Sequence, residues 1–578
     1  MSSLKLEQRR NHILKAALDH LSAASRQVLS TLALIVASVD YVTIEALSPH
    51  RPPIPWWLAK PKPPETRWFW RFLSEEPKAI LLNRYTSKVA KWKQGAMVKR
   101  WMAKCNVATE DLDSVLTDLT RNRGLLQYDG RSHLYELHPV VRSVVTSNLA
   151  EGEKIRAGER ILDHFTALPH NPYEQAKTME DVENGLQVVR TLLKLGHHQQ
   201  AADAYQGDLS HALLFNLEAH VEVLSLLRPF FPKGWGELPK GISSSHAADL
   251  ANMAGVALHW CGESSAALAA YGAIIPSDIA SHDWVNAIVQ LRNTTEDLVE
   301  QRQFARAIRI DSFALEISEM SATKESVFRS LLNLFRAYSL IGDLARASSV
   351  WNRVDPMGRH WRRGAYRQGS AEYHYAQFQF WQGTLQEEYL VAAVALANED
   401  DNRADVRRLH GLRGAWRLQQ GAWELAAASF DPAVAMARER RLVDAESETG
   451  LALAKYHLGH FTGDDARSEA ERLAQLRQPA HRYLATLWLT IGDTEQAKKH
   501  ALAAFRWAWA DGEPYVYRYE LTKTTELLRE MNVPIPNHQP YNPAEDKPFP
   551  WEAAVRAAID KLRAEKKAKE KAEKQKSD

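Results

Sequence analysis

The sequence predicts an all-α protein in two parts, a helical module with one short β-hairpin and then an α-solenoid of paired helices. Apolar residues recur with helical spacing over most of the 578 residues. Alternation typical of strands is confined to residues 125–137. A glycine–alanine–aromatic pattern recurs at steps of about 40 residues in the second half. A chain of this length is too long for one hydrophobic core, so several modules are expected.

Bulk composition excludes several classes of protein. The net charge is only +2, so the chain as a whole has no electrostatic preference for nucleic acid. The two cysteines, Cys105 and Cys261, lie far apart and lack metal-ligand spacing. Neither a disulfide framework nor a metal site is expected, and a cytoplasmic location fits. The apolar run 28–39 is too short to cross a bilayer and predicts a buried helix, and the N-terminus lacks a signal-peptide core.

Proline-rich breaks suggest where the modules end. They lie at 51–64, around 229–241 and at 533–550. The predicted organisation is an N-terminal module at 1–150 that carries a basic, Trp-rich insertion at 50–104, a helical linker with the first repeats at 151–240, a superhelix at 241–530, and a Pro-containing linker with a charged helical or disordered tail at 531–578.

The first elements are helices. Residues 12–48 predict two or three of them, and a further helix is expected over 110–121 with Thr109 as its N-cap. Gly124 is expected to end that helix, because glycine adopts the left-handed conformation that closes helices.

A β-hairpin and a final helix complete the N-terminal module. The strands are "LLQYD" at 125–129 and "LYELH" at 134–138, joined by a turn at Gly130. The last helix begins at Pro139, and proline is tolerated in the first turn of a helix. Helices followed by a β-hairpin are the layout of a winged helix.

Three stretches of this module are similar to the winged-helix domain of STAND (NB-ARC-type) ATPases, the class that includes MalT-like bacterial regulators: "LSAASRQVLSTLALI", "LTRNRGLLQYD" and "YELHPVVR". In that class the last stretch carries a Met/Leu-His-Asp motif whose histidine contacts the β-phosphate of bound ADP. His138 occupies the histidine position here, and Pro139 stands where aspartate is usual. The resemblance implies that His138 touches a nucleotide only if a partner supplies it.

No phosphate-binding loop accompanies this module. The sequence contains no G-x-x-x-x-G-K-(S/T) motif, and no apolar strand ends in paired acidic residues. Without backbone amides for the phosphates and a carboxylate for magnesium, phosphoryl transfer has no apparatus. The chain is therefore expected to be a separate subunit, a fragment or a degenerate relative that lacks the NTPase domain, with no cofactor of its own.

DNA binding by the winged helix competes with a structural, partner-packing role. The candidate recognition helix carries four carboxylates, Glu110, Asp111, Asp113 and Asp118. Phosphates would repel them, so the packing role is favoured.

The insertion at 50–104 is basic and aromatic. Between residues 51 and 104 it holds 13 Lys/Arg and three Glu, so the rest of the chain is acidic. Basic charge interleaved with rings suits nucleic acid or an acidic partner, and the basic amphipathic stretch at 84–104 also suits an anionic membrane surface. Packing of the rings on the winged helix is the favoured alternative. The candidate surface residues are Trp68, Trp70, Lys88, Lys91, Trp92, Lys93, Lys99 and Arg100.

The second half repeats the pattern (L/I)-G-x-x-x-x-A-x-x-x-(Y/F/W). The four clearest copies are Gly196, Ala201 and Tyr205; Gly262, Ala267 and Tyr271; Gly342, Ala347 and Trp351; Gly421, Ala426 and Phe430. Weaker copies lie at Arg302, Gly383, Gly459 and Gly492, so that successive steps from Gly262 are 40, 40, 41, 38, 38 and 33 residues. A non-repetitive bundle is the alternative that this spacing disfavours.

Physical chemistry explains each position of the pattern. Glycine ends the first helix of a pair and permits a tight turn. The alanine lets two helices approach closely, and the aromatic ring lies on the same face and fills the gap to the next pair. A single pair cannot bury its apolar face, so pairs stack into a superhelix. These residues resemble tetratricopeptide repeats in a longer form, over roughly 185–530.

The remaining constellations suggest no chemistry. His197 and His198 lie in a predicted turn without further ligands at helical spacing, and no local motif assembles a catalytic triad or a zinc site. The aromatic stretch 366–395 is expected mainly in the repeat core, with some rings in a groove that takes extended peptides. The sequence thus predicts a non-catalytic STAND-type sensor or scaffold that binds protein partners, possibly a P-loop NTPase in trans. The alternative is a nucleic-acid-associated adaptor that uses the basic insertion.

Overall fold

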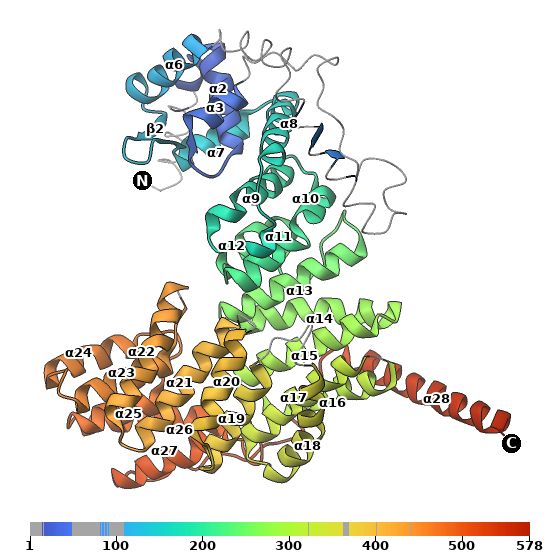
Figure 1. Ribbon diagram of the computed structural model, residues 1–578, viewed down its shortest axis with the longest axis vertical. Coiled ribbons are helices and arrows are strands. Elements are labelled where there is room, and N and C mark those ends of the chain that lie inside the picture. Colours follow the sequence, from blue (N-terminus) through green and yellow to red (C-terminus); the bar gives the residue numbers. More distant parts are fainter. Residues whose placement is uncertain are drawn as a thin grey trace. The chain divides into compact units, whose positions relative to one another are not determined.

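The computed structural model describes residues 17–48 and 109–577, apart from 322, 362–368, 400, 401 and 441, together with positions 14, 81, 84, 85, 87, 88 and 91. The chain forms two compact units, Met1–Asn216 and Leu217–Asp578, each with its own set of helices (Figure 1). The boundary between them falls inside the predicted segment 151–240.

The first unit begins with helices around a small antiparallel sheet. Its elements are α2 (Ala23–Leu34), β1 (Val39–Asp40), α3 (Tyr41–Leu47), α6 (Thr109–Thr117), a π-helical turn (Asp118–Asn122), β2 (Leu126–Asp129), β3 (Leu134–Leu137) and α7 (Pro139–Asn148). The predicted hairpin is present, with Leu126 opposite Leu137. The sequence analysis missed β1, which pairs with the free edge of β3 and gives the order β1-β3-β2.

Local chemistry sets where these helices start and stop. The Ser22 hydroxyl accepts the Ser25 amide at 3.0 Å and begins α2, and the Asp40 carboxylate accepts the Thr43 amide at 2.8 Å and begins α3. The helix expected to run to Arg121 stops as an α-helix at Thr117 and continues as the π-helical turn. Gly124, at φ +62°, ends that turn as predicted.

One apolar core holds the module together. It joins α2, α3, α6, the sheet, α7 and the following helix α8 (Glu151–Ala167). In the sheet, Leu126 and Leu137 face this core, whereas Gln127 and Glu136 are exposed, as alternation along a strand requires. Ile161 of α8 is fully buried in it, so α8 is part of the core rather than a spacer.

The first unit ends with further helices and two tight turns. They are α9 (Met179–Lys194), α10 (His198–Tyr205) and α11 (Asp208–His211), with a 3-10 turn at Tyr173–Gln175 and a π-helical turn at Ala212–Asn216. Lys194 donates to the carbonyls of Ala33 and Leu34 at 3.1 and 3.0 Å. Its ammonium therefore satisfies the last carbonyls of α2, where a cation also complements the helix dipole. Burial, and then Arg142 and Arg190, lowers the pKa of Lys194 to about 8.

The second unit consists of helices in consecutive packed pairs. After α12 (His220–Leu227), the pairs are α13 (Ser244–Trp260) with α14 (Ser264–Ser281), α15 (Trp284–Glu300) with α16 (Phe304–Ser321), α17 (Lys324–Ile341) with α18 (Leu344–Trp361), α19 (Ser370–Gln382) with α20 (Glu387–Glu399), α21 (Arg403–Gln419) with α22 (Trp423–Glu439), α23 (Ala445–His457) with α24 (Gly463–Ala474), and α25 (His481–Thr490) with α26 (Thr494–Trp509). This is the paired, solenoid-like arrangement that the repeats predict.

A residue with left-handed backbone joins the helices of each of these pairs. Six of the turns use glycine, namely Gly262, Gly342, Gly383, Gly421, Gly459 and Gly492, at φ between +70° and +86°. Arg302 takes the same conformation, at φ +63°, in the turn between α15 and α16. The chain therefore keeps its turn geometry where the glycine is missing, at the energetic cost of a side chain in the left-handed region.

The chain's last segment packs against the start of the superhelix. Beyond α27 (Arg518–Glu530) it extends to α28 (Glu552–Ser577), which packs on α14 and α16. Trp551, Val555 and Ile559 are buried in the same core as helices α15 and α16. The helix continues to Ser577, within the tail expected to be helical or disordered. Every described side chain beyond Leu562 is exposed.

Charged groups reinforce this contact. Arg306 donates to Asp546 at 2.7 Å and Arg309 donates to Glu552 at 3.1 Å. Burial acts to raise the pKa of Asp546, but hydrogen bonds from Arg309 and Arg306 outweigh it and lower the pKa to about 2. A segment expected to be a linker is thus bonded to α16 through buried carboxylates.

Candidate functional site

His138 lies at the start of α7. Its ring Nδ1 accepts the amide of Val140 at 3.3 Å, so the histidine caps its own helix. The ring is exposed, and so are Pro139 and Val140. This corner of the first unit therefore presents an imidazole and two apolar side chains to solvent.

Most of the basic insertion lies outside the described residues. Trp68, Trp70, Trp92, Lys93, Lys99 and Arg100 are among the positions that are not described. Lys88 and Lys91 are described, both in helical conformation with exposed side chains.

The repeat residues lie between the helices. The alanines Ala201, Ala267, Ala347 and Ala426 are completely buried. Tyr205, Tyr271 and Phe430 are buried as well, and Trp351 stacks on Tyr375 with ring centroids 4.2 Å apart. Gly196, like the turn glycines of the second unit, is left-handed, at φ +76°.

The aromatic rings fit against glycines that the pattern did not include. A Cβ on Gly255, in the preceding helix, would lie 2.3 Å from the Tyr271 ring. Phe430 fits between Gly414 of α21 and Gly450 of α23, where a Cβ would come within 2.6 and 2.5 Å of its ring. The Phe430 ring therefore fills the space on both sides of α22, against the preceding helix α21 and against α23 of the next pair.

A set of charged and aromatic residues on the first helices of successive pairs, and on α27 after the last pair, forms the candidate site, here called the inner cluster. It contains Trp260 of α13, Glu300 of α15, Arg336 of α17, Tyr373 of α19, Arg408 of α21, Glu446 of α23, Arg482 of α25 and Glu520 of α27. Successive members are 35 to 40 residues apart. That spacing, once the repeat had been recognised, was the signal that the sequence analysis overlooked.

Members of the inner cluster contact one another across several repeats. The Arg408 guanidinium lies 5.3 Å from the centre of the Trp260 ring and 5.8 Å from that of Tyr373. Arg336 pairs with Glu300 at 3.4 Å, and Arg482 pairs with Glu520 at 2.7 Å. First helices that are distant in sequence therefore face a common interior.

The environment of this interior changes the acid–base properties of its groups. Burial, and then the nearby Glu520 carboxylate, raises the pKa of Glu446 to about 7. Glu446 is nevertheless an exposed residue. Burial raises the pKa of Tyr373 to about 12.

Aromatic residues extend the cluster. Tyr519 of α27 lies 5.3 Å from Phe380 and 6.1 Å from Trp381, between ring centroids. Arg302, in the turn after α15, stacks 3.7 Å above the Trp507 ring of α26. The aromatic stretch around residue 380 thus contributes both to the repeat core, where Phe380 is buried, and to the inner cluster.

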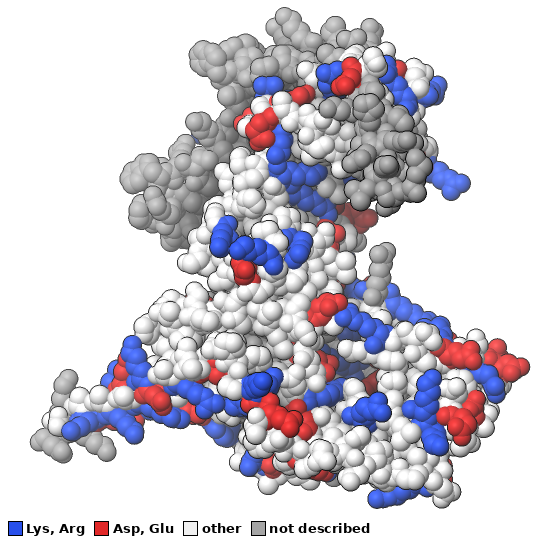
Figure 2. Space-filling view, turned by 180° about the vertical axis from the view of Figure 1, so that it is seen from behind, with Lys and Arg blue, Asp and Glu red and all other residues white. Residues whose placement is uncertain are grey.

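No metal site or membrane span is found in the described part of the chain. There, no group of three or more His, Cys, Asp or Glu side chains is placed to hold a metal ion. None of the described helices is long and apolar enough to cross a bilayer. In Figure 2, lysines and arginines alternate with acidic residues on the face of the second unit that is shown.

Comparison with known proteins identifies no family. No protein-family model matches the chain, and no curated protein matches it. Among solved structures, the chain is similar to a signal transduction ATPase with numerous domains (STAND) from Pyrococcus horikoshii that has a tetratricopeptide repeat sensor. The identity is 11%, the TM-score is 0.31, and the match covers 86% of this chain and 65% of that one, so this chain spans less than two thirds of the other's length.

Proposed function

We propose that this protein is a non-catalytic sensor or scaffold of the STAND type, which binds a partner protein through its inner cluster. The observation that carries the proposal is the gathering of one charged or aromatic residue from the first helix of each pair, α13 to α25, and from α27 on a common interior. Arginines, glutamates and rings together match a polypeptide, which offers charges, carbonyls and apolar side chains along its length.

The N-terminal module is proposed to be a winged helix that packs on a second subunit. The order of α2, β1, α3, α6, the hairpin and α7 supports this assignment. The exposed corner formed by His138, Pro139 and Val140 suits a protein contact, since Val140 leaves 46% of its surface uncovered. A P-loop NTPase is the partner that the family resemblance implies, with His138 near its nucleotide.

The test is affinity capture of the full chain from its native cell with two charge-reversal variants. Glu446→Lys changes the inner cluster, and Glu495→Lys makes the same change at an exposed position in the first turn of α26. We expect the wild type and Glu495→Lys to retain one specific protein and Glu446→Lys to lose it, with quantitative mass spectrometry as the readout. Equal recovery by both variants would rule out binding through the inner cluster.

Nucleic-acid binding by the basic insertion is the second candidate. The described lysines of that segment, Lys88 and Lys91, are exposed. Neutralising Lys88, Lys91, Lys93, Lys99 and Arg100 together should then abolish salt-dependent binding to DNA or RNA. No binding by the wild type at low salt excludes this candidate without affecting the first.

A further inference from the structure

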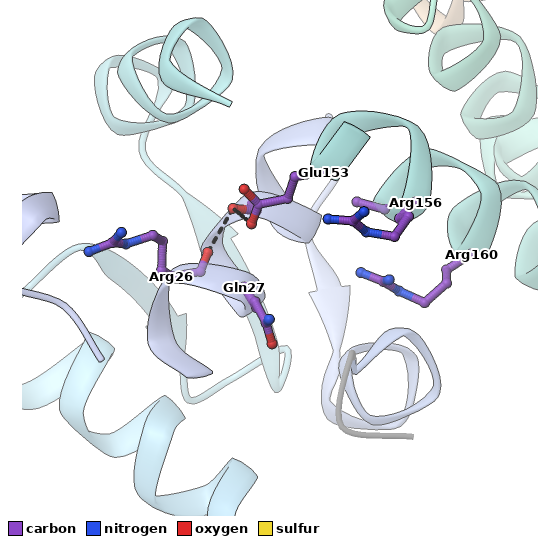
Figure 3. A pocket seen from close by; sticks show the side chains of 7 residues that line it. Arg26, Gln27, Glu153, Arg156 and Arg160 are labelled. Atoms are coloured by element: carbon purple, nitrogen blue, oxygen red, sulfur yellow. Dashed lines mark hydrogen bonds between the residues drawn. The ribbon is translucent and has the colours of Figure 1, made fainter. Parts of the chain in front are cut away.

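A pocket lies within the first unit, between α2 and α8. Its volume is about 330 Å³, and it is lined by Arg26, Gln27, Ser30, Glu153, Arg156, Ala157 and Arg160. Figure 3 shows the guanidinium groups of Arg156 and Arg160 reaching from α8 toward α2, whereas Arg26 points away from them. The guanidinium groups of two arginines on one helix thus enter the same pocket.

Within the part of the chain that the structure describes, neither arginine forms an ion pair with a carboxylate. They stand four residues apart on α8, where like charges destabilise a helix. Arg160 donates a hydrogen bond to the Thr31 hydroxyl at 3.2 Å, and its buried Nε has no partner among the described residues.

Among the described lining residues the one acidic side chain, Glu153, bonds to another lining residue rather than to either arginine. Glu153 accepts a hydrogen bond from the Ser30 hydroxyl at 3.3 Å, across the gap between the two helices (Figure 3). Burial, and then the neighbouring Arg156, lowers the pKa of Arg160. Both observations indicate an excess of positive charge that an added anion would relieve.

The chemistry of the lining selects the kind of anion. A guanidinium group binds the oxygens of a carboxylate or a phosphate in pairs. A phosphate group offers three terminal oxygens that two guanidinium groups can share, whereas a carboxylate offers two. None of the described lining residues carries a ring, so they offer a nucleobase nothing to stack on. The volume is at the low end for ligand sites and suits a small polar molecule.

We propose that this pocket binds the phosphate group of a small molecule, held by Arg156 and Arg160. The ligand would contact α2 of the N-terminal module and α8, the helix that follows the module, and would stabilise their packing by mass action. The protein would then respond to a small phosphorylated compound as well as to a protein partner. This proposal does not depend on the inner cluster.

The experiment is isothermal titration calorimetry on the full chain with inorganic phosphate, ribose 5-phosphate and ribose at constant ionic strength. Arg156→Gln combined with Arg160→Gln should weaken binding of the phosphate compounds by at least about tenfold, as loss of charged hydrogen bonds implies. Glu153→Gln should strengthen it by about fivefold, because the carboxylate repels the anion. A gain of affinity in Glu153→Gln is not expected from a merely structural role.

The control combines Arg121→Gln with Arg131→Gln, which removes the same charge from exposed positions of the first unit. It should bind like the wild type. Tighter binding of ribose 5-phosphate than of inorganic phosphate supports an esterified ligand, and equal binding of the two supports free phosphate. No binding of either compound, or equal binding by the wild type and the Arg156/Arg160 double variant, overturns the proposal.

Discussion

Arg482 of α25 donates two hydrogen bonds, of 2.7 and 2.9 Å, to the carboxylate of Glu520 in α27. Both side chains are largely buried, with 16% and 10% exposed. Although burial opposes the charge, Glu520 and nearby tyrosines raise the pKa of Arg482. The pair joins helices on either side of α26 and belongs to the inner cluster.

Breaking this pair from one side should destabilise the second unit strongly. Arg482→Ala leaves a buried carboxylate without its partner, which costs about 3–5 kcal/mol. Replacing both residues, as Arg482→Met with Glu520→Leu, should recover most of that loss. Urea unfolding followed by circular dichroism measures both. The control is Lys523→Ala in the exposed Lys523–Glu526 pair, which should change stability by less than about 0.5 kcal/mol. An equal loss of unfolding free energy in Arg482→Ala and in the double variant would show that the unpaired buried charge does not cause the destabilisation.

Gly450→Ala should destabilise α23 even though alanine favours helices. The new Cβ would lie 2.5 Å from the Phe430 ring, which Gly414 confines from the other side. Overpacking of this kind costs about 1–3 kcal/mol. Thermal unfolding should therefore show a lower midpoint for Gly450→Ala, partly restored by adding Phe430→Leu. The control is Gly463→Ala at the start of α24, where the added Cβ would meet no neighbouring atom within 4 Å. It should not lower the unfolding midpoint. A neutral Gly450→Ala would contradict the close packing.

Stability should fall between about pH 6.5 and pH 4 because of His500. Burial, followed by His481 and Lys499, lowers the pKa of His500 from 6.5 to about 4. The unfolded chain therefore binds a proton in this window that the folded chain does not, so stability is complete above pH 6.5 and decreases as the pH falls. His500→Gln should reduce the loss of unfolding free energy on acidification by roughly 2 kcal/mol.

The measurement is the unfolding midpoint at pH 7.0 and pH 4.5. His197→Gln, in an exposed turn of the first unit, serves as the matched control. An unchanged pH dependence in His500→Gln would mean that other groups govern acid unfolding.

Trp551→Ala should destabilise the superhelix by about 3–5 kcal/mol. Trp551 is 7% exposed, and its ring stacks on Phe549 and lies beside Gly272 of α14. Removal of residues 565–578 should change stability by less than about 0.5 kcal/mol, since the described side chains there are exposed. Calorimetric unfolding distinguishes the two. A large effect of the truncation would mean that the far end of α28 contributes to the fold.

Local signals made much of the fold predictable. Strand alternation around residues 126–137 predicted the hairpin, because side-chain period and turn residues are encoded over a few positions. Gly262, Gly342 and Gly421 predicted the turns for the same reason, since only glycine enters the left-handed region at no steric cost. The strand β1 was missed, because a strand of two residues is too short to show the alternation of apolar and polar side chains.

The inner cluster could not be predicted from local pattern. Trp260 and Arg408 are far apart in the sequence and meet only because successive pairs rotate by small amounts that accumulate over four repeats. Arg302 is a second case that local pattern does not explain, because it occupies a turn position where the repeat pattern has glycine. Its stacking on Trp507 is a long-range contact, which is absent from the local sequence.

The return of the last segment to α14 and α16 has a consequence for biosynthesis. Solenoids ordinarily fold from neighbour to neighbour, so each repeat can be completed soon after it leaves the ribosome. Here α16 is covered by Trp551, which is synthesised roughly 230 residues later. At about 10 residues per second, the delay between the two is on the order of 20 s. During that interval apolar side chains that the finished protein buries lack their final cover. The nascent chain is thus exposed to chaperones and proteases until its last helix has been made.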